Sequence, residues 1–345
     1  MPDFFVDRII NLESDVDTFF EMLAQAVKHN GGSIDGIGQA ELRGGNAVNT
    51  ASALAALNVR VTPIICTSAL GLELVKLYLN SKLVDLSHTK IVSRTSLTTA
   101  LEFTSKRERT NVMLRDVGDL ADFGPHFLDE EDFQVLGEAD YVCVFNWAGT
   151  KRFGTHLAET VFRYVKESGK GKTYYDTADP TPKKKEAQTL IRKVFLSKYV
   201  DILSLNENEA ICFASQMNED KLESIQFSDR ESLALESARR LAAKMSTRID
   251  LHTTSCSATI TSKNETVVPA FQVSLLRATG AGDAWNSGNI LGDALGLTDE
   301  LRLALANAVA GYYVSDPMGA HPSLEQLIGF CKKLGRQVDS PYRIA

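Results

Sequence analysis

The sequence predicts an α/β protein in which a mainly parallel β-sheet lies between layers of helices. Strand-like and helix-like patterns alternate along most of its 345 residues, which is typical of parallel sheets with helical crossover connections. A hydrophobic content of 44% in a chain of this length is enough for one large core and a smaller element. The last third of the chain is mostly helical in pattern.

Short apolar runs rich in β-branched and aromatic residues predict the strands. We expect strands at 61–67, 141–145, 173–176, 200–205 and 249–253. Two alternating stretches, 258–261 and 266–271, predict an antiparallel pair around Lys263-Asn264. Helical periodicity predicts helices at 72–83, 156–166, 184–196 and 233–245. Ligands of such sheets bind beyond the carboxyl ends of the strands.

A second, smaller element is indicated by polar, strand-like stretches, one around the first glycine pair and one at 97–115. A helix-like stretch, 16–28, ends at Gly31-Gly32 and forms an insertion near the N-terminus. We therefore divide the chain into a core, 44–91 and 116–345, and a smaller part, 1–43 and 92–115.

The most specific motif is Thr279-Gly280-Ala281-Gly282-Asp283, which opens a helix. Its glycines let backbone N–H groups approach a ligand, and the helix N-terminus adds unpaired donors and the positive end of its dipole. Asp283 is placed to take the proton of an acceptor hydroxyl while these donors hold a transferring phosphoryl group. In the alternative interpretation the motif is a plain strand-to-helix turn, where Asp283 stabilises the helix by about 0.3–1 kcal/mol.

A second glycine pair opens a helix in the run Arg43-Gly44-Gly45-Asn46-Ala47-Val48-Asn49. Asn46 and Asn49 fall on one helical face and offer donors and acceptors suited to hydroxyl groups. We interpret this segment as a binding site for a small polar ligand, with a simple helix cap at Asn46 as the alternative.

A third polar motif, Asn206-Glu207-Asn208-Glu209, follows directly on a predicted strand. Asn206 and Glu209 suit a hydrated magnesium ion and nucleotide phosphates. The alternative is structural, because an N-cap at Asn206 with Glu209 in the fourth position also forms a capping box.

Composition limits the partners. The net charge of −7 is modest and the basic residues are dispersed, which argues against a nucleic-acid surface. The chain contains no long apolar run and no basic and apolar leader, so we expect no membrane partner and a cytoplasmic protein. Small metabolites are the expected ligands.

In this order and spacing, the three motifs resemble the ribokinase family of small-molecule kinases, also called the PfkB carbohydrate kinase family. The resemblance covers most of the chain. It extends to 6–12, which is similar to an early segment where an aspartate binds substrate hydroxyls, and to 305–310 and 319–323, which are similar to the closing segment around the nucleotide and a monovalent cation. It implies a ribokinase-like three-layer sandwich with a small β lid, formed here by 1–43 and 92–115.

The resemblance also implies a role for each matched residue. Asp283 would be the general base, and the backbone at Gly280, Ala281 and Gly282 would hold the transferring phosphate. The acceptor would be bound by Asp7, Gly44, Gly45, Asn46 and Asn49. The nucleotide side would include Asn206, Glu209, Thr253, Thr279 and Asn307, with Glu209 contacting magnesium through water.

The expected ligands are ATP, Mg²⁺ and an acceptor whose hydroxyl is phosphorylated. A monovalent cation is left open, because Arg277-Ala278 stands where an Asp-Thr pair often precedes the last motif. We expect the lid to exclude water from the site and to form a homodimer contact.

The acceptor class has two candidates, a sugar first and a nucleoside second. A non-catalytic metabolite sensor is a different hypothesis, motivated by the short segment before Asp7 and by the 253–258 stretch, which lacks the usual two glycines. A dinucleotide-dependent oxidoreductase is disfavoured, because no Gly-x-Gly-x-x-Gly opens the first predicted strand-helix unit.

Overall fold

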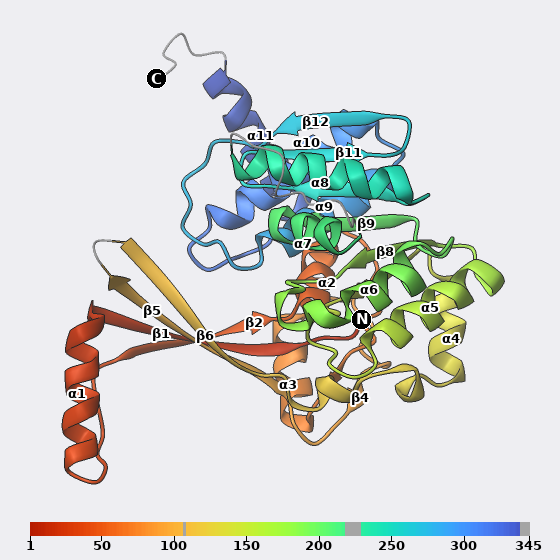
Figure 1. The fold of residues 1–345 in the computed structure, drawn as a ribbon. Helices are drawn as coiled ribbons and strands as arrows, with labels where there is room; N and C mark the ends of the chain where they lie inside the picture. Colours follow the sequence, from red (N-terminus) through yellow and green to blue (C-terminus); the bar gives the residue numbers. More distant parts are fainter. Residues whose placement is uncertain (106–107, 218–228, 339–345) are drawn as a thin grey trace.

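The computed structural model describes residues 1–105, 108–217 and 229–338 (Figure 1). Its largest sheet has six strands in the order β12-β11-β10-β9-β8-β7. Strands β7 to β10 run parallel, whereas β11 and β12 are antiparallel to their neighbours. The strands are β7 (Tyr141–Phe145), β8 (Lys172–Asp176), β9 (Ile202–Asn206), β10 (Arg248–His252), β11 (Cys256–Ile260) and β12 (Glu265–Pro269).

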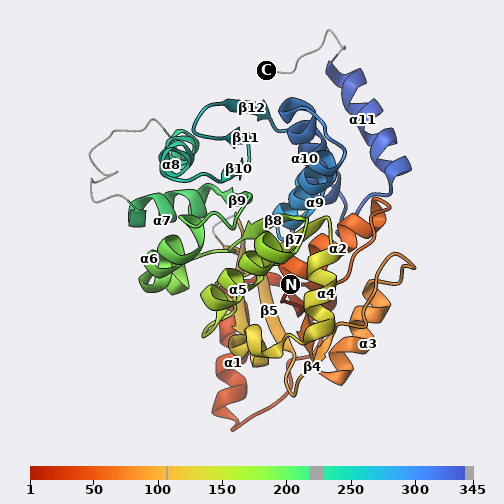
Figure 2. The ribbon, with the colours of Figure 1, turned by 90° about the vertical axis from the view of Figure 1, so that its right-hand side faces the viewer.

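Helices cover both faces of this sheet, so the body has three layers (Figure 2). On one face, α5, α7 and α8 contact the strands, and on the other α2 and α10 do so with α9 packed between them. Helix α5 illustrates the cause, since its apolar residues at 157, 158, 161, 162 and 165 fall on one buried side. These helices are α2 (Asn46–Ala56), α5 (Gly154–Ser168), α7 (Glu207–Met217), α8 (Arg230–Lys244), α9 (Ala281–Ala294) and α10 (Asp299–Val314).

The remaining helices are peripheral, and in the described part of the chain none is long and apolar enough to cross a bilayer. They are α3 (Ala69–Tyr78), α4 (Glu130–Glu138), α6 (Ala187–Leu190) and α11 (Leu324–Val338), with short turns of 3₁₀ or π type at η1 (Gly118–Asp122), η2 (Pro125–Phe127), η3 (Thr181–Glu186) and η4 (Ile191–Phe195).

A second sheet extends from the body, with α1 (Val16–Lys28) along its outer end (Figure 1). Its order is β2-β1-β5-β6, with β1 parallel to β5 and the other neighbours antiparallel. Its strands are β1 (Phe5–Asp15), β2 (Gly38–Gly44), β5 (Ser96–Ser105) and β6 (Glu108–Asp116), and a separate short pair joins β3 (Cys66–Thr67) to β4 (Lys90–Ile91).

Most predicted elements are confirmed with shifts at their ends, including the four strands from 141 to 253 and the hairpin in the body, and the helix at 16–28 beside the second sheet. The strand predicted at 61–67 is wrong in length. Only Cys66–Thr67 forms a strand, besides one bridge from Val61 to Val84. Among the described residues, the backbone bonds between this segment and 83–92 involve Val61, Ile65 and Thr67 but none of 62–64, and Pro63 has no N–H to donate. The helix predicted at 184–196 is divided among η3, α6 and η4, with a non-helical backbone at Lys183 between two prolines and α6.

Candidate active site

The two glycine-opened helices, α2 and α9, pack against each other, and a hydrogen bond from Asn46 to Asp283 joins their first turns. Gly45 precedes α2 with φ +94° and Gly280 precedes α9 with φ +89°, a conformation that favours glycine. A side chain at Gly45 would also meet the backbone of Asp3 and Phe4 at 2.9 Å. These glycines therefore fix where each helix starts and leave its first N–H groups at the site.

The Asp283 carboxylate is the meeting point of the two helices. Asn46 Nδ2 donates to its Oδ1 and Asn49 Nδ2 donates to its Oδ2, each at 2.9 Å. The residue is only 6% exposed, and this burial raises the pKa of the carboxyl well above its ordinary value. The two amide donors act in the opposite direction, while the nearby Asp176 and Asp3 raise it further. The structure thus brings three predicted residues, Asn46, Asn49 and Asp283, into contact at one carboxylate.

The backbone beside Asp283 offers donors for an anion. Among the hydrogen bonds of the described residues, none uses the N–H of Gly282 or Asp283, whereas Ala281 donates to the Ala278 carbonyl. A side chain at Gly282 would lie 3.1 Å from the His252 ring, and one at Gly280 would clash with the Tyr313 hydroxyl. Two free donors at a helix N-terminus form a site suited to a phosphate group.

Asp7 lies in the second sheet, where β1 pairs with both β2 and β5. Its carboxylate occupies the space beside Gly44, so that a side chain at Gly44 would overlap it. Burial raises the pKa of Asp7, while a hydrogen bond with Thr98 and the charges of Arg115 and Arg277 oppose that effect. The Asp7 carboxylate thus lies beside Gly44, the residue before the Gly45 turn into α2.

Asn206 and Glu209 form a reciprocal capping box at the start of α7. This is the arrangement that we gave as the alternative to a role in magnesium and phosphate binding. Glu209 N donates to Asn206 Oδ1 at 3.0 Å, and both carboxylate oxygens of Glu209 accept from Asn206, one from its N and one from its Nδ2. Burial and the charge of Asp176 raise the pKa of Glu209 well above its ordinary value.

Three other predicted residues lie farther along the same end of the sheet. Thr253 closes the turn between β10 and β11, with its Oγ1 accepting from Cys256 N at 2.9 Å. Asn307 is fixed by three protein groups, since its Oδ1 accepts from Ser257 and Trp285 and its Nδ2 donates to the Pro269 carbonyl. The Thr279 carbonyl accepts from Tyr313 Oη at 2.9 Å.

Sequence reasoning missed three residues that hold the site. Asp3 is buried and accepts from the backbone N–H of Asn46 and of Ala47, at 2.8 and 2.9 Å, so it caps α2. Asp176 ends β8 and accepts from Asn286 Nδ2 in α9. Arg43 donates from Nε to Asn49 Oδ1 and lies 3.2 Å from His321 Nδ1. Two of these residues had a positional signal in the sequence. Arg43 directly precedes the glycine pair, and Asp176 ends a predicted strand.

The described side chains do not form a direct magnesium site. No group of three or more His, Cys, Asp or Glu residues among them is arranged to hold a metal ion. The carboxylate of Glu209, the predicted indirect contact, has both oxygens engaged by Asn206.

The model of the pfkB family carbohydrate kinases matches residues 24–326. No curated protein matches the chain. Among solved structures, ribokinase from Arabidopsis thaliana complexed with ribose and ATP is 16% identical with a TM-score of 0.72, over 96% of this chain and 97% of that one. Adenosine kinase from Sinorhizobium meliloti is 17% identical with a TM-score of 0.71, over 96% and 98%. At such identities the structures show a shared ribokinase-like fold. Because its family model spans most of the sequence, the chain belongs to the pfkB family of carbohydrate kinases, which are phosphotransferases.

Proposed function

We propose that the chain is an ATP-dependent kinase that transfers the γ-phosphate to a hydroxyl of a sugar or sugar-like acceptor. The observation that supports this most strongly is the first turn of α9. There a buried carboxylate, Asp283, stands beside two free backbone donors, and amides from α2 hold its oxygens. Direct phosphoryl transfer requires removal of the acceptor proton and binding of the phosphate. The Asp283 carboxylate would perform the first step and the adjacent backbone donors the second.

In the proposed reaction, the acceptor oxygen forms a bond to the γ-phosphorus as the bond to the bridging oxygen of ATP breaks. The acceptor proton passes to Asp283, and ADP leaves with the electron pair of the broken bond. The N–H groups of Gly282 and Asp283, with the Gly280 turn before them, stabilise charge on the transferring phosphate, at about 3–4 kcal/mol per donor. No covalent enzyme intermediate is needed.

The acceptor would be held by Asp7, the Gly44-Gly45 backbone, Asn46 and Asn49. Asp7 and the two asparagines supply acceptors and donors for hydroxyl groups, and the glycines let the ligand approach the main chain. Asn46 and Asn49 now bind Asp283, so the acceptor hydroxyl would enter beside this cluster. We rank a sugar before a nucleoside, and the solved structures that share the fold include kinases named for each.

The nucleotide would lie along the carboxyl ends of β9 and β10, near Asn206, Thr253, Thr279 and Asn307. ATP would bring Mg²⁺ on its phosphates, with Glu209 reaching the ion only through water. Because Asn206 and Asn307 are already engaged by protein groups, we expect them to shape this region more than to contact ATP.

The test is ADP release from ATP and magnesium across hexoses, pentoses, polyols and nucleosides. Release that depends on one class of acceptor supports the kinase and names its substrate class. Measurable ATP binding without release for any acceptor would favour the metabolite-sensor hypothesis. Release with nucleosides alone would reverse our ranking of the two acceptor classes.

The pH dependence of turnover should report on the Asp283 carboxylate. The charged form is the base, and burial raises its pKa, so activity falls as pH decreases through that raised pKa. Asn49→Ala removes a donor that favours the charged form, so the acidic limb of the kcat/KM profile should move to higher pH. Thr50→Val is the control, because the Thr50 hydroxyl donates to the Asp283 carbonyl and not to its carboxylate. An acidic limb that is identical in both variants would contradict the role of Asn49.

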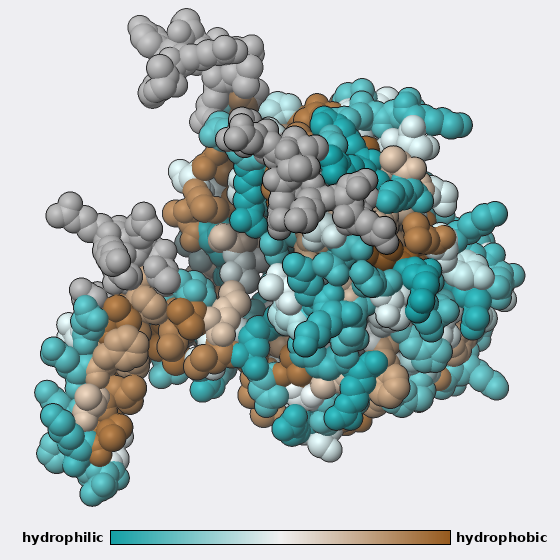
Figure 3. Space-filling model, in the orientation of Figure 1, coloured by the Kyte–Doolittle hydropathy of each residue, from teal (hydrophilic) through white to brown (hydrophobic). Residues whose placement is uncertain are grey.

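A homodimer through the lid is the expected assembly, and α1 supports it. Phe20, Leu23 and Val27 form an apolar stripe on this helix and are 58, 44 and 68% exposed. Figure 3 shows apolar residues gathered over α1 and the adjoining strands of the second sheet. Such a patch on a surface helix is typical of a protein contact.

Phe20→Glu should therefore convert the dimer to a monomer, because a charge in the contact must be desolvated. Light scattering coupled to size exclusion measures the mass. Gln25→Glu introduces the same charge at an exposed polar position of α1 and should leave the dimer intact. A monomeric parent chain, or equal behaviour of the two variants, would refute the contact.

A further inference from the structure

Two arginines beside the candidate active site lack an acidic partner. Arg43 directly precedes the Gly44-Gly45 pair, and Arg277 lies in the loop before α9. Both side chains are partly buried, yet no salt bridge among the described residues includes either of them. The buried Arg302, by contrast, pairs with Asp250. Because a cation withdrawn from water is ordinarily paired, the two unpaired arginines call for an anion.

Arg43 is held by neutral groups. Its Nε donates to Asn49 Oδ1 at 3.0 Å, and its Nη2 donates to His321 Nδ1 at 3.2 Å. A guanidinium only donates, so Nδ1 is the unprotonated nitrogen of this imidazole. Burial and the charges of Arg43 and Arg277 hold the pKa of His321 well below its ordinary value, so the ring is uncharged. Burial and the charge of Arg277 also lower the pKa of Arg43.

Arg277 reaches the same cluster through Tyr313. Its Cζ lies 5.9 Å from the centroid of the Tyr313 ring, and that ring stacks on His321 with centroids 5.0 Å apart. Arg277 Nε donates to the Thr279 carbonyl at 3.4 Å. Its Nη1 lies beside Gly319, where a side chain would approach it to 2.9 Å. These contacts orient the guanidinium without neutralising it.

Both arginines lie next to residues that would hold the acceptor. The Asn49 amide accepts from Arg43 through its oxygen and donates to Asp283 through its nitrogen, so one amide separates the guanidinium from the proposed base. Burial raises the pKa of Asp7, and the charge of Arg277 is among the effects that oppose it, which places Arg277 near Asp7. An acceptor that meets Asp283 and Asp7 would therefore have both cations close by.

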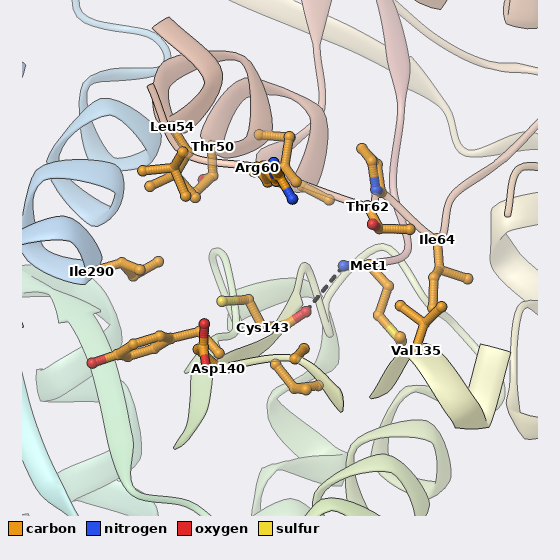
Figure 4. A pocket seen from close by; sticks show the side chains of 18 of the residues that line it. Met1, Thr50, Leu54, Arg60, Thr62, Ile64, Val135, Asp140, Cys143 and Ile290 are labelled. Carbon is orange, nitrogen blue, oxygen red and sulfur yellow. Dashed lines mark hydrogen bonds between the residues drawn. The ribbon is translucent and has the colours of Figure 1, made fainter. Parts of the chain in front are cut away.

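The cavity beside β7 is a poorer place for a charged sugar (Figure 4). It has a volume of about 580 Å³ and includes Arg60, but most of the side chains around it are apolar, among them Leu54, Ile64, Val135 and Ile290. Such walls offer no partners for the hydroxyls of a sugar, whereas the asparagines of the candidate site do.

We propose that the acceptor is an anionic sugar, carrying a phosphate or a carboxylate, and that Arg43 and Arg277 bind this group. The inference rests on the proposed kinase function and narrows its acceptor class. Guanidinium groups bind both kinds of anion through paired N–H donors. An anion bound by both arginines would supply the acidic partner that each lacks and would offset their mutual repulsion. A neutral sugar or a nucleoside would leave both charges uncompensated.

The test compares ADP release with neutral acceptors and their anionic counterparts. Glucose is paired with glucuronate and with glucose phosphorylated at its first or its last carbon, and ribose with the corresponding ribose phosphates. Both phosphate positions are used because a phosphate on the reacting hydroxyl would block transfer. We expect kcat/KM to be about 10- to 100-fold higher for an anionic acceptor than for its neutral counterpart. The anion with the larger ratio identifies the bound group as phosphate or carboxylate.

Arg277→Leu should bring this ratio close to one, mainly by raising KM for the anionic acceptor. Arg192→Leu is the matched control, because it makes the same change at an exposed arginine of η4 and should leave the ratio as it is. Equal kcat/KM for neutral and anionic acceptors, or a ratio that Arg277→Leu does not change, would overturn the proposal and leave the kinase function standing. A rise in KM for ATP alone would assign Arg277 to the nucleotide phosphates and would also overturn it.

Calorimetric titration with the anionic sugars in the absence of ATP separates this inference from the proposed function, because binding does not require turnover. Tighter binding to the parent chain than to Arg277→Leu, without ADP release from ATP, would support the anion site and contradict the kinase. Equal binding of neutral and anionic sugars to the parent chain would contradict the anion site, whatever the turnover.

Discussion

Asp283→Asn will lower kcat by about 10²- to 10⁴-fold while leaving the affinity for ATP nearly unchanged. The amide has almost the same shape as the carboxylate but accepts no proton at neutral pH. The backbone donors of Gly282 and of residue 283 remain, so the phosphate site is kept. The measurement is ADP release with the preferred acceptor, beside a calorimetric titration with ATP.

Asp293→Asn is the matched control, because it makes the same change near the other end of α9. Asp293 pairs with Lys172 and Arg248 and lies outside the site. This variant should lose some stability and keep its kcat. If Asp283→Asn retains full turnover, Asp283 is not the base. If it loses ATP binding together with turnover, the carboxylate serves to hold the loop.

The sequence allowed the local parts of this site to be predicted. Glycine at 45 and 280 adopts positive φ directly before a helix, and the helix then fixes which residues stand in its first turn. This local geometry places Asn46 and Asn49 at the start of α2 and Asp283 at the start of α9. The motifs therefore predicted the positions of these three residues. The capping box of Asn206 and Glu209 is equally local, since its partners are three residues apart.

The long-range contacts were not predictable from spacing. Asn46 meets Asp283 across 237 positions, and Arg43 meets His321 across 278. Asp3 caps α2 only because the chain before β1 lies against it. Such contacts depend on how whole helices and strands pack against one another. This packing produces no periodic pattern in the sequence from which it could be predicted. The shortened strand near 61–67 has the same origin, because pairing requires a neighbour and not only an extended, apolar segment.

The position of α9 depends on a buried ionic cluster that no motif indicated. Arg302 of α10 is 1% exposed and donates to Asp250 of β10 at 3.1 Å. It also bonds Asn289 of α9 and Thr259 of β11. Burial would raise the pKa of Asp250, but the charges of Arg248 and Arg302 outweigh it and hold that pKa below its ordinary value. The cluster therefore ties α9 and α10 to the sheet.

Arg302→Met should destabilise the protein by about 3–5 kcal/mol, because it removes one partner of a buried pair and leaves Asp250 with a single cation. Methionine fills similar space, so the loss reports on the charge more than on packing. Urea unfolding measures it, and Asp299→Asn is the control, since Asp299 is the more exposed partner of Arg302 and its loss should matter by less than about 1 kcal/mol. A loss for Arg302→Met as small as that of the control would show that the cluster contributes little. Adding Asp250→Asn to Arg302→Met should recover part of the loss, because the buried carboxylate that has lost one of its two cations is then gone. No recovery would indicate that Arg302 acts through its hydrogen bonds to Asn289 and Thr259 instead.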